Sequence, residues 1–113
     1  MAKRAIAVSR ASRDALAVLG AQVKIARVRR GWTQAGLAAR IGVDARTVSA
    51  VERGSPNVAV GTAFNAAFTT GVNLFGLEGD ELALARRRGE EVLALLPGHV
   101  RAAPVTDPAD DDF

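Results

Sequence analysis

Residues 31–54 read GWTQAGLAARIGVDARTVSAVERG, and this stretch decides the fold. Thr33 and Asp44 are residue types that cap helix N-termini, because their side chains accept a hydrogen bond from a free backbone N–H. Gly42 and Gly54 suit the left-handed conformation in which many helices end. The stretch therefore predicts two short helices, each of about nine residues, joined by a tight turn.

Each of these predicted helices has an apolar inner stripe. Leu37, Ala38 and Ile41 recur at helical spacing in the first, and Val48 and Val51 do so in the second. Two short helices with glycine at the turn match the helix-turn-helix signature. An α-helix fits the major groove of B-DNA, where base edges can be distinguished. The outer face of the second helix is thus the candidate DNA-reading surface.

The rest of the chain predicts an all-α protein in four parts. Residues 1–11 form a flexible basic arm, residues 12–78 a five-helix DNA-binding domain, residues 79–97 an additional C-terminal helix, and residues 98–113 a disordered acidic tail. Ser12 is the predicted N-cap of the first helix, which ends before Gly31. A fourth helix falls within residues 58–71, and residues 72–77 form a short fifth element.

The aromatic residues are expected to pack within the fold. Phe64, Phe68 and Phe75 are expected in the core, as aromatic side chains at helical spacing are usually buried. Trp32 is expected in the core or at its rim, closing the turn between the first two helices, rather than as a stacking platform for bases.

Composition and charge narrow the classes of function. The chain has no cysteine and one histidine, which rules out a disulfide framework and a thiolate metal site. Residues 20–60 hold seven basic and two acidic residues, whereas residues 61–113 hold four basic and nine acidic ones. This asymmetry indicates a polyanionic partner for the first part and a different partner for the second. No apolar run has the length of a membrane span and no signal peptide is evident, so we expect a cytoplasmic, nucleoid-associated protein.

The motifs in residues 19–77 resemble the Xre family, which includes the lambdoid phage repressors and their Cro partners. The resemblance rests on short blocks in the expected order: Gly31-Trp32-Thr33-Gln34, Leu37-Ala38, Ile41-Gly42-Val43, Thr47-Val48-Ser49 and Glu52-Arg53-Gly54. It implies that the second helix of the motif contacts DNA bases through four of its positions, which are occupied here by Ala45, Arg46, Ser49 and Ala50. Arg46 is the strongest candidate for bidentate contact with guanine. The two alanines can touch only a thymine methyl group.

The resemblance also separates backbone contacts from scaffold contacts. Gln34 occupies the position of the family's phosphate clamp, and the further phosphate candidates are Arg53, Arg30 and Arg40. For Arg40 singly, an ordinary solvated position is an equally good interpretation. Arg27 and Glu52 occupy positions that form a partly buried salt bridge between the first and third helices of the chain.

The resemblance is greatest to HipB-type antitoxins. It implies a homodimeric repressor that binds double-stranded operator DNA with two half-sites, binds a HipA-like kinase toxin and represses its own operon. The apolar segment with Val72, Leu74 and Phe75 is the expected dimer interface, and Phe113 at the end of the acidic tail is a candidate anchor for the partner. The alternatives are a phage-type or stand-alone regulator without a toxin, and an interaction module that has lost DNA binding. No catalytic constellation, cofactor or metal site is evident, so we expect no enzymatic activity.

Overall fold

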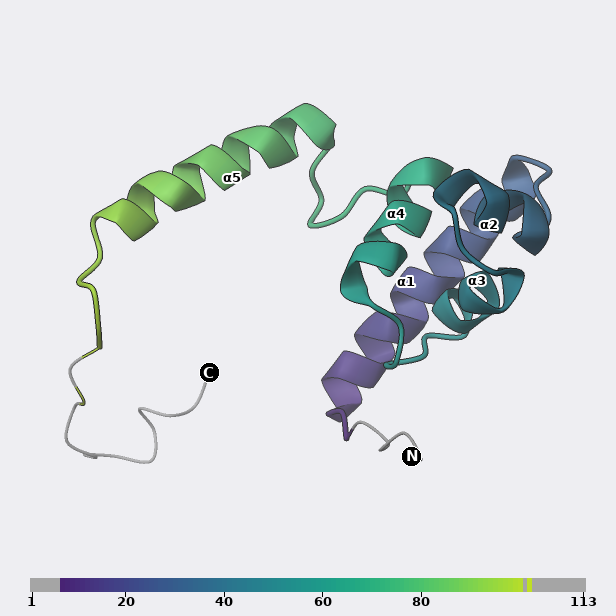
Figure 1. Ribbon diagram of the computed structural model, residues 1–113, viewed down its shortest axis with the longest axis horizontal. Coiled ribbons are helices and arrows are strands. Elements are labelled where there is room, and N and C mark those ends of the chain that lie inside the picture. The colour runs from purple at the N-terminus through teal and green to yellow at the C-terminus, as the bar shows by residue number, and fades with distance from the viewer. Residues whose placement is uncertain (1–6, 101, 103–113) are drawn as a thin grey trace. The chain divides into compact units, whose positions relative to one another are not determined.

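The computed structural model describes residues 7–100 and 102. Within this part of the chain there are five helices and no strand, which confirms the predicted all-α fold (Figure 1): α1 Arg10–Arg29, α2 Gln34–Ile41, α3 Ala45–Glu52, α4 Val60–Thr70 and α5 Gly79–Ala94. Helices α1 to α4 belong to a first compact unit that extends to Gly79, and the rest of α5 belongs to a second unit.

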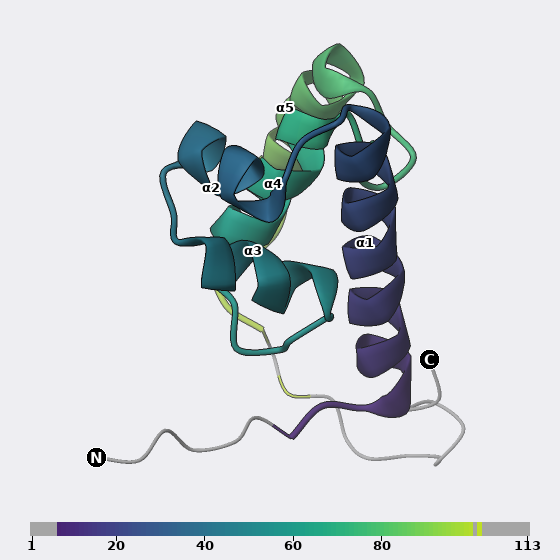
Figure 2. The ribbon, with the colours of Figure 1, turned by 90° about the vertical axis from the view of Figure 1, so that its right-hand side faces the viewer.

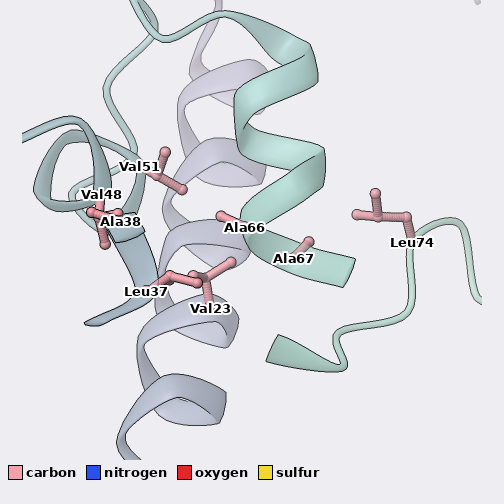
Figure 3. Packing of buried hydrophobic residues seen from close by; sticks show 8 residues of the cluster. All are labelled: Val23, Leu37, Ala38, Val48, Val51, Ala66, Ala67 and Leu74. Atoms are coloured by element: carbon pink, nitrogen blue, oxygen red, sulfur yellow. The ribbon is translucent and has the colours of Figure 1, made fainter. Parts of the chain in front are cut away.

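The core of the first unit forms where α3 and α4 pack against the long helix α1 and α2 packs against α3 and α4 (Figure 2). Its buried apolar side chains come from all four helices and the segment after α4 (Figure 3): Val23, Leu37, Ala38, Val48, Val51, Ala66, Ala67 and Leu74. The predicted inner stripes of α2 and α3 are thus confirmed at Leu37, Ala38, Val48 and Val51. Ile41 packs against this cluster at its edge.

Local capping chemistry fixes the boundaries of the two central helices. Thr33 Oγ1 accepts a hydrogen bond from the Gly36 backbone N–H at 2.9 Å, and Asp44 Oδ1 accepts one from the Arg46 backbone N–H at 2.7 Å. Gly42 follows α2 with a φ of 73°, a conformation that glycine adopts without a Cβ penalty. The predicted caps and stop of the helix-turn-helix are therefore confirmed.

Helix α1 begins three residues earlier than the sequence predicts. Ser9, not Ser12, is the N-cap, and its Oγ accepts a hydrogen bond from the Ser12 backbone N–H at 3.0 Å. Both serines are suitable caps, and the earlier one allows an additional turn of helix. The predicted arm of residues 1–11 is accordingly too long at its C-terminal end, while residues 1–6 lie outside the described chain.

Residues 72–77 do not form a fifth helix. Leu74 and Leu77 are joined by an isolated antiparallel bridge, and the Leu77 backbone N–H donates to the Leu74 carbonyl at 3.0 Å. Phe75 and Gly76 lie between them with φ values of 58° and 67°, so both are left-handed. For a bulky residue such as Phe75 this conformation costs on the order of 1–3 kcal/mol. The helix-turn-helix unit therefore has four helices rather than five.

Two of the predicted core aromatics lie on the surface. Phe75 is 75% exposed and Phe68 is 45% exposed, whereas Phe64 is partly buried and packs against the core. The small residues Ala66 and Ala67 take the positions of closest packing. The three rings instead form a surface cluster, with Phe64 edge-to-face to Phe68 at 6.5 Å and to Phe75 at 6.1 Å.

Helix α5 has no buried residue in the described chain. It continues without interruption through Gly89. Its i,i+4 pair Arg86–Glu90 is exposed and lies on the helix surface. Four leucines of the second unit are exposed: Leu84, Leu93, Leu95 and Leu96.

Candidate nucleic-acid interface

A buried ion pair holds the two helices of the motif against α1. Arg27 Nε donates to Glu52 Oε2 at 2.6 Å and Arg27 Nη2 donates to Glu52 Oε1 at 3.0 Å, joining α1 to the end of α3. The third contact of the guanidinium, from Nη1 to the Trp32 carbonyl at 2.8 Å, fixes the turn before α2. Only 9% of the Arg27 side chain and 3% of the Glu52 side chain are exposed. The structure thus contains the scaffold pair that the resemblance implies.

Gln34 belongs to the same network. Its Nε2 donates to Glu52 Oε1 at 3.1 Å, so the first residue of α2 is tied to the last residue of α3. This bond uses one of the two N–H donors of the amide, and the other is compatible with the predicted phosphate contact. The network therefore sets the relative position of the two helices and orients Gln34 at the same time.

The network keeps Glu52 ionised. Burial alone would raise the pKa of the Glu52 carboxyl, but hydrogen bonds from Arg27 and Gln34 and the charges of Arg27 and Lys24 outweigh it, so the pKa lies below its usual value of 4.5. The hydrogen bond to Glu52 raises the pKa of Arg27 despite burial. Both partners are thus charged over the whole physiological pH range.

Arg46 is the most prominent cation on the outer face of α3. Its side chain is 93% exposed and stands at the second residue of the helix. Asp44 lies beside it, with 3.3 Å between Arg46 Nε and Asp44 Oδ1. The Arg46 backbone N–H and then its side chain lower the pKa of the Asp44 carboxyl. This exposed ion pair is held weakly, so the guanidinium can exchange Asp44 for a base edge at little cost.

The other predicted base-contacting positions are all partly buried, and one of them packs against the core. Ser49 and Ala50 are partly exposed. Ser49 Oγ accepts a hydrogen bond from Arg53 Nη1 at 2.6 Å, which leaves its hydroxyl proton able to donate elsewhere. Ala45 packs partly against the core, so its methyl group is a poorer candidate for contact with DNA than the sequence implies.

The remaining phosphate candidates are held by Trp32 and α4. Arg40 Cζ lies 3.9 Å and Arg30 Cζ lies 5.3 Å from the centroid of the Trp32 ring. Arg30 Nε also donates to the Thr70 carbonyl at 2.9 Å, at the C-terminal end of α4. Trp32 is partly buried, as predicted, and its ring positions arginines by cation–π contact. Arg30 and Arg40 therefore have scaffold contacts, and their contacts with phosphate remain predictions.

A shallow groove of about 460 Å³ runs between α3 and the start of α4. Arg46 and Ala50 line one side, and Asn57 and Thr62 add polar side chains from the other. Neither Asn57 nor Thr62 was among the residues predicted to contact DNA. Asn57 comes close to the outer face of α3 because the chain turns back after Gly54. The helical periodicity of the sequence does not predict the direction of this turn.

The three predicted dimer residues differ in how far the structure buries them. Leu74 is buried in the protomer's own core and Val72 packs against that core, whereas Phe75 is exposed. Since Leu74 is covered within one chain, it offers little surface for a direct contact, and the dimer interface stays a prediction. Phe113 and the tail from residue 103 lie outside the described residues.

Comparison with known proteins gives one match. A family model described as a helix-turn-helix domain matches residues 18–85, which is more than half of the chain. Neither the curated proteins nor the solved structures contain a match. Among the described residues, no helix is long and apolar enough to cross a membrane.

Proposed function

The chain belongs to the Xre/Cro-like type of helix-turn-helix domain, and from this premise we propose that it is a sequence-specific transcriptional repressor that acts as a homodimer on two half-sites. The observation that carries the proposal is the arrangement of α3. Val48 and Val51 are buried while Arg46 is almost fully exposed near the N-terminal end of the helix. An exposed arginine at this place can reach a guanine edge when the helix enters the major groove.

The contacts divide into two groups under this proposal. Arg46 and Ser49 read bases, with Ala50 against a thymine methyl group, while Gln34 and Arg53 contact phosphates. The Arg27–Glu52 pair does not touch DNA and positions the reading helix. The protein acts by binding and not by catalysis.

A salt-titrated binding assay on the DNA upstream of the protein's own gene tests the assignment of Arg46. Replacing Arg46 by alanine should weaken specific binding by about 5- to 150-fold, the loss of about 1–3 kcal/mol expected for one bidentate base contact. Arg88→Ala removes an equal charge from exposed α5 and is the matched control, for which binding should stay within about twofold. Equal effects of the two substitutions would show that only net charge matters.

The finer proposal is that the repressor is the antitoxin of a HipA-like kinase toxin. Its support is the sequence resemblance and the acidic second part of the chain, which suits a partner other than DNA. Co-expression with the product of the adjacent reading frame, followed by purification of a stable complex, tests it. A neighbouring gene that encodes no kinase-like protein would instead favour a stand-alone or phage-type regulator.

An interaction module without DNA binding is the second class of function to be distinguished. It is favoured by the alanines at two of the four base-reading positions. In that case the wild-type protein would show no salt-dependent affinity for any duplex, since no phosphate would be neutralised on binding.

A further inference from the structure

Asp44 is the one exposed carboxylate within residues 31–54, all of which the structure describes. The other acidic residue of the motif, Glu52, is paired with Arg27, and only 3% of its side chain is exposed. The Asp44 side chain is 58% exposed and immediately precedes α3. A carboxylate in this position faces the phosphates of any DNA that α3 contacts, and like charges repel.

The N-cap of α3 does not by itself require this negative charge. Asp44 Oδ1 accepts a hydrogen bond from the Arg46 backbone N–H at 2.7 Å, and the neutral side chains of asparagine and serine cap helices about as well. The preceding helix, α2, has the neutral cap Thr33. The helix dipole favours an anion at this place only weakly when the site is exposed. The carboxylate of Asp44 therefore indicates a role besides capping.

The second contact of the carboxylate is with the side chain of Arg46. Arg46 Nε lies 3.3 Å from Asp44 Oδ1, and Arg46 Nη2 lies 3.5 Å from Asp44 Oδ2. A guanidinium carries five N–H donors, so this contact leaves the edge between Nη1 and Nη2 available. Two parallel N–H donors on such an edge match the O6 and N7 acceptors of guanine. Arg46 therefore need not leave Asp44 in order to reach a base.

We propose that Asp44 is a positioning residue that sets base specificity, because its carboxylate restrains Arg46 so that the remaining edge of the guanidinium faces guanine. The inference rests on the proposed function, in which Arg46 reads a base. Restraining a long, flexible side chain before binding lowers the conformational entropy that binding must remove. The ion pair strengthens when α3 enters the groove, since water is displaced and the local dielectric constant falls.

The charge of Asp44 also weakens binding to unrelated DNA. Where no guanine faces Arg46, the carboxylate still repels the phosphates, and no base contact compensates for this repulsion. A residue that strengthens the correct contact and penalises the others increases the ratio of specific to non-specific affinity. Asp44 thus acts on specificity more than on affinity.

Binding to a panel of duplexes tests the proposal. The panel replaces each base pair of the DNA upstream of the protein's own gene in turn, and includes a scrambled duplex of the same composition. The base pair read by Arg46 is the one whose replacement no longer weakens binding of Arg46→Ala. The wild type should discriminate at this base pair by about 5- to 150-fold. Asp44→Asn should reduce that discrimination at least about threefold and bind the scrambled duplex about two- to fivefold more tightly.

Two further variants separate the ion pair from the cap and from net charge. Asp44→Ser also keeps a capping side chain and should lose the same discrimination, and both Asp44 variants should melt within about 4 °C of the wild type. Asp80→Asn is the matched control, because Asp80 likewise accepts a backbone N–H at the start of a helix, from Glu81 at 3.1 Å, but belongs to α5. It should leave discrimination unchanged at every base pair.

The coupling between the two side chains gives the sharpest result. In the Arg46→Ala background, Asp44→Asn should cause no further loss of discrimination at any base pair, since the residue that it positions is absent. A further loss there would overturn the proposal. Equal losses at all base pairs in the single variant, or melting temperatures lowered by more than about 10 °C in both Asp44 variants, would also overturn it, because Asp44 would then serve only to place α3.

Failure of this inference can be distinguished from failure of the proposed function. A wild type that discriminates through Arg46, together with Asp44→Asn and Asp44→Ser variants that discriminate equally well, would refute the role of Asp44 alone. A wild type that binds its own upstream DNA no more tightly than the scrambled duplex would refute the proposed function and this inference with it.

Discussion

Replacing Glu52 by glutamine should destabilise the domain more than any exposed charge substitution. The change preserves the shape of the side chain but removes the negative charge that faces Arg27. Arg27 is only 9% exposed, and two of its three hydrogen bonds end on Glu52. The substitution therefore leaves a buried guanidinium without its counter-charge, which costs roughly 3–5 kcal/mol.

This magnitude is large for a domain of this size. About 80 residues correspond to a free energy of unfolding of roughly 4–12 kcal/mol. The melting temperature should accordingly fall by at least about 12 °C, since each kcal/mol shifts it by about 4–8 °C. Thermal and urea denaturation, followed by circular dichroism at one fixed protein concentration, measure the change.

The chain contains a matched control in α5. Arg86 and Glu90 form an ion pair whose side chains are 64% and 60% exposed, so Glu90→Gln should cost only about 0.3–0.5 kcal/mol. The double substitution Arg27→Met with Glu52→Leu should recover most of the loss, because it removes both buried charges together. Equal small effects of Glu52→Gln and Glu90→Gln would refute the claim that the buried pair holds the motif together.

Two further predictions concern pH and glycine packing. The pKa of Glu52 in the folded protein lies below its unfolded value, so ionised Glu52 stabilises the fold above a pH of about 4.5, and this stabilisation is lost as the pH falls through the folded pKa. The acid denaturation curves of the wild type and of Glu52→Gln should therefore converge at low pH. Curves that stay parallel would contradict this. Gly20→Ala should cost about 1–3 kcal/mol by thermal denaturation, because a Cβ atom would lie 2.5 Å from the Val51 carbonyl oxygen. Gly89→Ala, with no atom within 4 Å of its Cβ position, should stabilise α5 by about 0.5–1 kcal/mol and slow amide exchange in that helix. A stabilising Gly20→Ala together with a destabilising Gly89→Ala would contradict the packing of α1 on α3.

Local signals in the sequence were sufficient to predict where the two helices of the helix-turn-helix motif begin and end. Thr33 and Asp44 cap α2 and α3 as predicted, and the stop at Gly42 follows from the left-handed conformation that only glycine adopts readily. These features depend on a few neighbouring residues, so they can be recognised without knowledge of the tertiary structure. The alternative caps Ser9 and Ser12 show the limit, because both satisfy the same local rule.

Burial within an apolar helix could not be predicted in the same way. Helix α4 is apolar around most of its circumference, so periodicity does not decide which side faces α1. The close packing that buries Ala66 and Ala67 leaves Phe68 at the surface. Likewise, the exposure of Phe75 follows from a turn whose left-handed residues include a phenylalanine, contrary to the usual residue preference.

The central claim is that α3, positioned by the Arg27–Glu52 pair, presents Arg46 to DNA. Amide chemical-shift mapping of the isotopically labelled protein, titrated with duplex DNA from upstream of its own gene at physiological salt, tests this claim most directly. The largest changes should fall on residues 44–50 and on Gln34, with α5 unaffected. Changes confined to α5, with residues 44–50 unperturbed, would contradict it.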